Sequence, residues 1–437
     1  MNHVLPLPWD QALDAGRVPV YGIPEWYCWY HDRTDFQIPV EGVIEECLDA
    51  HRAVGIRNIV WNCGRGRVDY WSDVAGVTRL DEGCDASENS SAGFKTRAMA
   101  RECPLRRALE YGGRQGMTLL GRLAMNRHYG TGEMPYTALE RAHPDCLEKD
   151  KRGRLVRHKL CYAFEEVRRE RRGILLEIQR IGVAALVLDF CRQVPILQYH
   201  EKLVEPFRQR TGVDPRQIDS ADTARHAEWF QHRADILTDF MRELRVEVRR
   251  QESALGRPCP VIARIPDSAP WLLLAFGIDL ERWFAEDLID ATMLSPFPLA
   301  AEDPERHFEM HVEWAHRHGK PCIGGLGSLN LIAGDGAVPN RDPEAFYDPR
   351  PAYEIVDRQF CAGVDAISVY QSENLTRQPY LRQLLEDLPQ RDAVAQRLRE
   401  LPHSRFPADY PLGLDWHAKW DGRYGVRRKA IHSIRDM

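Results

Sequence analysis

Short apolar runs alternate with longer amphipathic segments from about residue 18 to about residue 375. The run Ala184–Asp189 shows no alternation of polar and apolar residues before its final aspartate. Such continuous runs are typical of strands that are covered on both faces. The alternation therefore predicts repeated βα units around a parallel sheet rather than a sandwich or a helical array.

Eight strands are expected, which is the number that closes a barrel. We predict an α/β protein that forms a (β/α)8 TIM barrel with enlarged βα loops and a short C-terminal extension. The predicted strands are Pro19–Tyr21, Asn58–Asn62, Thr118–Ala124, Ala184–Asp189, Pro260–Arg264, Asp290–Leu294, Pro321–Gly325 and Asp365–Tyr370. The rival fold, an open doubly wound sheet, would need a nucleotide fingerprint that the sequence lacks.

The domain organisation follows from the same pattern. Residues 1–385 are predicted to form the catalytic barrel, and residues 386–437 a C-terminal helix and an aromatic, proline-rich tail. Leucines at helical spacing predict the final helix over Tyr380–Leu401. The tail is expected to pack on the barrel or on another subunit, so a homo-oligomer is one of the expectations. Long polar insertions, Gly66–Arg97 and His128–Arg157, are predicted to form walls of a substrate cleft.

Composition narrows the classes of function. The net charge is only -6, and basic residues are interspersed with acidic ones, so we expect no nucleic-acid partner. None of the 11 cysteines forms a Cys-x-x-Cys pair, which favours reduced thiols and a cytoplasmic location. The sequence has no signal-peptide pattern and no apolar run of about 18 residues, so no membrane partner is expected.

Carboxylates at predicted strand ends are the candidate catalytic groups, because barrel enzymes carry their chemistry on that edge. Asp189 closes the fourth strand and is the leading candidate. Arg122 on the third strand is predicted to point into the barrel, where it needs a carboxylate partner such as Asp189. For the second carboxylate we favour Glu373 over Asp267 and Glu25.

Other polar and aromatic residues near strand ends are predicted to bind substrate. Tryptophan faces commonly stack on sugar rings, although the tryptophans here are as readily interpreted as a cover over the barrel mouth. The predicted substrate-binding residues are Glu25, Trp26, Trp61, Asn62, Arg122, Asn126, His128, Arg192, Arg264, Ser295, Tyr370 and Asn374.

Metal and nucleophilic-serine chemistry are not expected. The 16 histidines show no ligand spacing, and His307, His311, His316 and His318 are interpreted as the solvated face of one helix. No Gly-x-Ser-x-Gly motif occurs, and no cofactor is expected. Two carboxylates with arginine, asparagine and aromatic neighbours favour cleavage of a glycosidic bond.

Four segments resemble the TIM barrels described as family-10-type glycosyl hydrolases of environmental bacteria: Ile56–Gly64, Arg122–His128, Leu186–Arg192 and Gly363–Tyr370. Asn126, His128, Asp189 and Arg192 match the motifs of that family. The chain departs from it at Arg127, where the family has an acid, and at Ala184-Ala185, where Asp-Gly is usual. The resemblance implies a carbohydrate-active barrel and a carbohydrate partner.

We therefore expect a glycoside hydrolase that acts on small glycosides or oligosaccharides. Asp189 is expected to be the nucleophile by analogy with other barrels, with general acid as the alternative role. A sugar lyase, epimerase or isomerase would instead use Asp189 or His128 as a base. A carbohydrate-binding pseudo-enzyme would bind the sugar without turnover.

Overall fold

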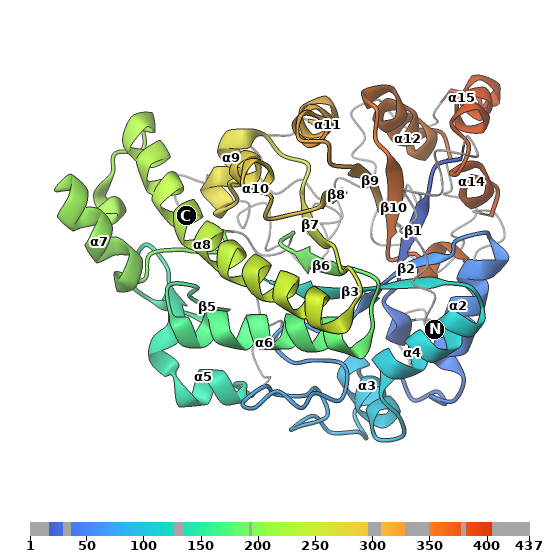
Figure 1. Ribbon diagram of the computed structural model, residues 1–437, viewed down its shortest axis with the longest axis horizontal. Helices are drawn as coiled ribbons and strands as arrows, with labels where there is room; N and C mark the ends of the chain where they lie inside the picture. Colours follow the sequence, from blue (N-terminus) through green and yellow to red (C-terminus); the bar gives the residue numbers. More distant parts are fainter. Residues whose placement is uncertain are drawn as a thin grey trace.

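The computed structural model describes residues 17–28, 36–125, 135–191, 195–295, 307–327, 349–376 and 382–403. Eight parallel strands close into a barrel in the order β1-β10-β9-β8-β7-β6-β3-β2 (Figure 1). These are β1 Val20–Ile23, β2 Asn58–Asn62, β3 Thr118–Ala124, β6 Leu186–Asp189, β7 Val261–Pro266, β8 Ala291–Ser295, β9 Cys322–Gly327 and β10 Ala366–Tyr370. The predicted (β/α)8 barrel is confirmed, and each predicted strand matches an observed one.

Helices surround the strands (Figure 1). The larger ones are α2 Val43–Ala53, α3 Ser91–Met99, α4 Pro104–Arg114, α6 Glu165–Ile181, α8 Thr223–Leu255, α11 Phe308–Arg317 and α12 Arg350–Ala362. Shorter elements are η1 Trp26–Cys28, α9 Pro270–Phe276, α10 Leu280–Ala285 and α13 Glu373–Thr376. No helix in the described part of the chain is long and apolar enough to cross a membrane.

The loops after β3 and β6 carry elements that the sequence pattern did not predict. After β3 come α5 Ala138–Ala142, η2 Pro144–Cys146 and an antiparallel pair, β4 Leu147–Lys149 with β5 Leu155–Leu160. After β6 come α7 Glu201–Thr211 and η3 Pro215–Gln217. Both insertions follow the carboxyl ends of barrel strands and therefore lie on the edge where barrel enzymes carry their sites.

Two expectations about helices need correction. The predicted final helix is two helices, α14 Arg382–Asp387 and α15 Arg391–Glu400, and the expected domain boundary falls inside α14. Pro389 lies between them, and proline lacks the N–H that would continue a helix. On α11, His311 is fully buried and its Nε2 lies 3.1 Å from the Ser268 carbonyl, so only part of the predicted histidine face is solvated. That helix packs one face on the barrel, which explains the burial.

The barrel interior is filled by layers of side chains. Along each strand successive side chains point to opposite faces, so residues two apart share the interior. Val60 of β2, Leu120 of β3, Val187 of β6 and Ile262 of β7 belong to one buried apolar cluster. The next inward position on each of these strands is polar, and it lies at the carboxyl edge.

His51 of α2 ties the outer layer to the C-terminal end of β10. Its Nδ1 lies 2.6 Å from the Cys47 carbonyl and its Nε2 2.7 Å from the Ser372 hydroxyl, so the neutral ring donates at Nδ1 and accepts at Nε2. A Cβ on Gly22 of β1 would lie 2.7 Å from the His51 ring, which is why this strand position is glycine. Burial lowers the pKa of His51 to about 4.

We predict a stability loss in mild acid that depends on His51. Its folded pKa lies below the unfolded value of 6.5, so its contribution is present above pH 6.5 and is lost as pH falls toward 4. The shift corresponds to about 3 kcal/mol at full protonation of the unfolded chain. Urea unfolding at about pH 7.5 and about pH 5 should show a smaller stability change for His51→Gln than for the parent. An equal change in the two proteins would contradict this account of His51.

Candidate active site

A layer of polar side chains lies directly above the apolar layer of the barrel. It is formed at the inward positions two residues beyond Val60, Leu120, Val187 and Ile262. In the strand register Arg122 pairs with Asn62, and Asp189 pairs with Arg264. The strand residues of this polar layer are Asn62, Arg122, Asp189 and Arg264, each at most 4% exposed.

Asp189 is held by two arginines and a backbone amide. Arg264 Nη1 lies 3.0 and 2.9 Å from its two carboxylate oxygens, and Arg122 Nη1 lies 3.1 Å from Oδ2. The Cys191 amide donates to Oδ1 at 3.0 Å. Burial acts to raise the pKa of Asp189, but the charges of Arg264 and Arg122 outweigh it and hold the pKa below the ordinary value. The predicted pairing of Arg122 with Asp189 is confirmed.

Glu25, just past β1, shares the same arginine. Arg122 Nη2 donates to Glu25 Oε1 at 2.7 Å, and the Tyr27 hydroxyl donates to Oε2. Burial opposes ionisation of Glu25, but Arg122, Arg65 and the Tyr27 hydrogen bond together lower its pKa to about 2. One guanidinium group therefore bridges two ionised, buried carboxylates.

The polar layer extends outward through the loop after β2. Asn62 Nδ2 lies 3.1 Å from Asp69 Oδ2 and 3.5 Å from Glu25 Oε2, and Lys95 Nζ of α3 lies 2.9 Å from Asp69 Oδ2. Sequence analysis did not single out Asp69 and Lys95. They lie in an insertion without periodicity, so no local pattern marks them as neighbours of the barrel.

On the opposite side, Arg264 and Tyr370 complete the layer. Arg264 Nη2 donates to the Ser295 hydroxyl at 3.0 Å. The guanidinium carbons of Arg264 and Arg122 lie 4.7 and 5.7 Å from the centre of the Tyr370 ring. Both arginines thus have an aromatic ring within cation–π distance as well as carboxylate partners.

Glu373 and Asp267, the other two predicted catalytic acids, are both buried. Glu373 is 0% exposed and its Oε2 accepts a 3.0 Å hydrogen bond from the backbone amide of Glu25. It also lies near α2, because its charge adds to burial in raising the pKa of the Cys47 thiol. Asp267 is 3% exposed and directly follows β7. The structure therefore brings Glu25, rather than Glu373, to the arginine that holds Asp189.

The tryptophans lie differently from the predicted sugar-stacking arrangement. Trp26 and Trp61 are 0% exposed and stack on each other, with ring centres 5.9 Å apart and planes 5° apart. Each ring face that a sugar would need is covered, so these rings pack the wall of the barrel. Asn126, His128 and Arg192 lie outside the described residues, as does the side chain of Asn374.

Among the residues that the structure describes, no group of three or more His, Cys, Asp or Glu side chains is placed to hold a metal ion. The polar layer instead alternates acid and base: Glu25, Asp189 and Asp69 face Arg122, Arg264 and Lys95. Such a layer has fixed donors and acceptors and holds its charges in place before any ligand arrives.

We predict that Arg122→Met destabilises the fold strongly, because it leaves two buried carboxylates without their shared counter-charge. The expected loss is about 3–5 kcal/mol in the free energy of unfolding, measured by denaturant titration. Arg114→Ala, which removes an exposed pair with Glu110, should cost less than about 1 kcal/mol. Adding Glu25→Gln and Asp189→Asn to Arg122→Met should restore part of the loss. Equal losses in the two single variants would refute the bridging role.

Sequence comparison finds no match: no protein-family model and no curated protein matches this chain. Solved structures match in fold. The glycoside hydrolase domain of PgaB (BpsB) from Bordetella bronchiseptica superposes with a TM-score of 0.52 at 12% identity, covering 85% of this chain and 99% of that one. The catalytic domain of β-amylase from Paenibacillus polymyxa gives a TM-score of 0.51 at 10% identity, covering 88% and 98%.

A third similar structure is α-L-fucosidase isoenzyme 2 from Paenibacillus thiaminolyticus. It superposes with a TM-score of 0.50 at 11% identity, covering 87% of this chain and 49% of that one. At these identities the likeness concerns the fold alone. The chain has the barrel fold found in several kinds of glycoside hydrolase, and the resemblance to family-10-type enzymes in particular is not shown.

Proposed function

We propose that this protein is a glycoside hydrolase whose reaction centre is the polar layer at the carboxyl edge of the barrel. The observation that carries the proposal is the Arg122 bridge between two ionised carboxylates, that of Glu25 just past β1 and that of Asp189 at the end of β6. Cleavage of a glycosidic bond passes through an oxocarbenium-like state, which anionic oxygens stabilise. The fold shared with glycoside hydrolases of several kinds supports the same class of reaction.

The lowered pKa values restrict the roles of these two acids. Glu25 and Asp189 are ionised at neutral pH, so they suit a nucleophile or a stabiliser of positive charge. A general acid must instead be protonated when the reaction begins. We assign that role to Asp267, which is buried at the carboxyl end of β7, the strand next to that of Asp189.

Glu373 acts, in this proposal, as a positioning residue. Its carboxylate accepts the backbone amide of Glu25 and thereby fixes the chain where it leaves β1. Because Glu25 must face Arg122, a displaced backbone would misplace its carboxylate. This role replaces the expectation that Glu373 is the second catalytic acid.

A carbohydrate-binding barrel without turnover is the second candidate. It is favoured by the hydrogen bonds on Asp189, since both of its oxygens already accept from Arg264 and one also accepts from Arg122. A carboxylate so held is a weak nucleophile. The lyase, epimerase or isomerase alternatives would use Asp189 or His128 as a base that titrates near neutrality. The lowered pKa of Asp189 does not favour it in that role, and His128 lies outside the described residues.

We predict different leaving-group dependences for the acid variants, measured on a panel of aryl glycosides and oligosaccharides. Asp267→Asn should lose about 10²–10⁴-fold in kcat on poor leaving groups and much less on activated nitrophenyl glycosides, because those need no proton donor. Asp189→Asn and Glu25→Gln should have a lowered kcat on both kinds of substrate. Circular dichroism controls for folding. If wild-type protein binds sugars but turns over none of the panel, the barrel without turnover is the better description.

A second prediction separates positioning from catalysis at Glu373. Glu373→Gln keeps an oxygen that can accept the Glu25 amide, so kcat should stay within about 5-fold of the parent. Glu373→Leu removes that acceptor and should lower kcat by about 10²-fold with little change in KM. The loss in kcat of Glu373→Leu should vary with pH, because a displaced Glu25 carboxyl no longer has the low pKa that its contact with Arg122 gives it. If both variants lose activity equally, Glu373 is a catalytic residue and the positioning role is wrong.

A further inference from the structure

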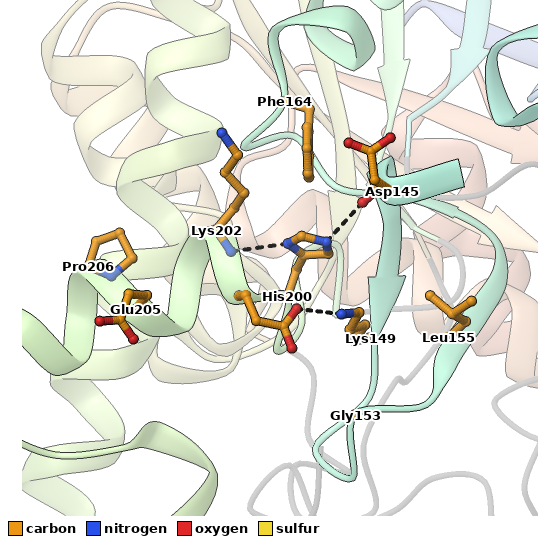
Figure 2. Close-up of a pocket in the computed structure, with 10 residues that line it drawn as sticks. Asp145, Lys149, Gly153, Leu155, Phe164, His200, Lys202, Glu205 and Pro206 are labelled. Atoms are coloured by element: carbon orange, nitrogen blue, oxygen red, sulfur yellow. Dashed lines mark hydrogen bonds and ion pairs between the residues drawn. The ribbon is translucent and has the colours of Figure 1, made fainter. Parts of the chain in front are cut away.

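A groove of about 870 Å³, lined by none of the polar-layer residues, lies between the β4–β5 pair and the start of α7 (Figure 2). Its walls belong to the two insertions that follow β3 and β6, the strands that carry Arg122 and Asp189. The volume is within the range of small-molecule sites. The groove therefore lies on the insertions that follow two strands of the proposed reaction centre.

The two walls are joined by hydrogen bonds that span the insertions. The Tyr199 amide donates to the Lys149 carbonyl at 2.9 Å, and Lys159 Nζ donates to the Pro195 carbonyl. The Tyr162 hydroxyl donates at 2.5 Å to the carbonyl of Met125, directly past β3. These bonds fix the width of the groove without a ligand, and the last one fastens the β4–β5 insertion to the end of a barrel strand.

The floor of the groove is a fixed aromatic pair. His200 caps α7, accepts from the Lys202 amide at 3.1 Å and lies 2.9 Å from the Asp145 carbonyl, as the dashed lines in Figure 2 mark. Its ring packs edge-to-face on Phe164 with centres 4.9 Å apart, and Lys202 Nζ lies 5.2 Å from the Phe164 ring centre. Burial lowers the pKa of His200, which keeps the floor uncharged at neutral pH.

The walls combine both signs of charge with apolar surface. Lys149 and Glu201 form a 2.6 Å ion pair across the groove side, and Leu155 is 60% exposed at the wall. The lining holds three acidic and two basic side chains, so a polyanion or a polycation would meet like charges as well as opposite ones. A neutral ligand with many hydroxyl groups and an apolar ring face finds acceptors, donors and apolar contacts together. The charged lining residues are Asp145, Lys149, Glu201, Lys202 and Glu205.

We propose that this groove is a second carbohydrate-binding site, which holds the distal residues of a neutral oligosaccharide whose other end lies at the polar layer. The inference rests on the proposed function and adds that the substrates are oligosaccharides rather than single glycosides. The apolar contact at Leu155 supplies the selectivity for chain length, because short glycosides do not reach it.

The test uses Leu155→Asp, a change at an exposed side chain that lies outside the polar layer. Leu255→Asp, at a 38% exposed leucine that ends α8, is the matched control. Calorimetry measures binding of malto-, cello-, manno- and chito-oligosaccharides of two to six units. An apolar contact of this size should be worth about 10-fold or more in affinity for the longest chain that binds. Leu155→Asp should lose that affinity, whereas Leu255→Asp should bind the oligosaccharides as tightly as the parent does. The kinetics of both variants on aryl monoglycosides should match those of the parent.

The outcomes distinguish the two proposals. Oligosaccharide binding that Leu155→Asp weakens, in a protein without hydrolytic activity, would support the groove and refute the hydrolase. Hydrolysis with binding that Leu155→Asp leaves unchanged would refute the groove and leave the hydrolase intact. Failure of every oligosaccharide in the panel to bind would also overturn the groove.

Discussion

A single buried charge, the guanidinium of Arg122, governs the arrangement of the barrel mouth. An arginine that points into a barrel cannot be left unpaired, since an isolated buried charge costs far more than the fold can supply. Its two terminal nitrogens are satisfied by Glu25, which follows the first barrel strand in chain order, and by Asp189, which ends the fourth. Asp189 in turn binds Arg264, and Glu25 is held by Tyr27 and Glu373. The ion pairs of Arg122 therefore join parts of the chain that closure of the barrel brings together, and the same ion pairs set the geometry of the polar layer.

The same constraint explains how far the sequence could predict the structure. The strands were predictable because buried parallel strands have continuous apolar runs, and period-two alternation places Arg122 inside the barrel, on the strand beside that of Asp189. Pro389 is a local signal for a break between two helices, but the leucines on its two sides keep the spacing of one continuous helix. In contrast, the stacking of Trp26 on Trp61 depends on which face each ring turns to the helix layer. No residue spacing encodes that choice.

The acid that shares Arg122 with Asp189 was the hardest feature to predict. Glu25, Asp267 and Glu373 all follow strand ends, and sequence position alone gives them equal access to the mouth. What separates them is direction: the Glu25 carboxylate meets Arg122, while that of Glu373 meets a backbone amide. Asp69 and Lys95, which form an ion pair in the outer part of the polar layer, lie in an insertion. Contacts between residues far apart in an insertion produce no periodic pattern in the sequence. Insertions thus supply both the outer part of the polar layer and the walls of the groove beside α7.

In the proposed function, the carboxylates of Glu25 and Asp189 stabilise positive charge on a sugar ring. Binding of iminosugars, whose protonated ring nitrogen resembles that charge, tests it most directly. Deoxynojirimycin and its stereoisomers should include a ligand that binds the wild-type protein, measured by calorimetry near neutral pH. That ligand should bind about 10²-fold more weakly to folded Asp189→Asn and Glu25→Gln. Equal affinity for the three proteins, or no binding by any stereoisomer, would contradict the claim.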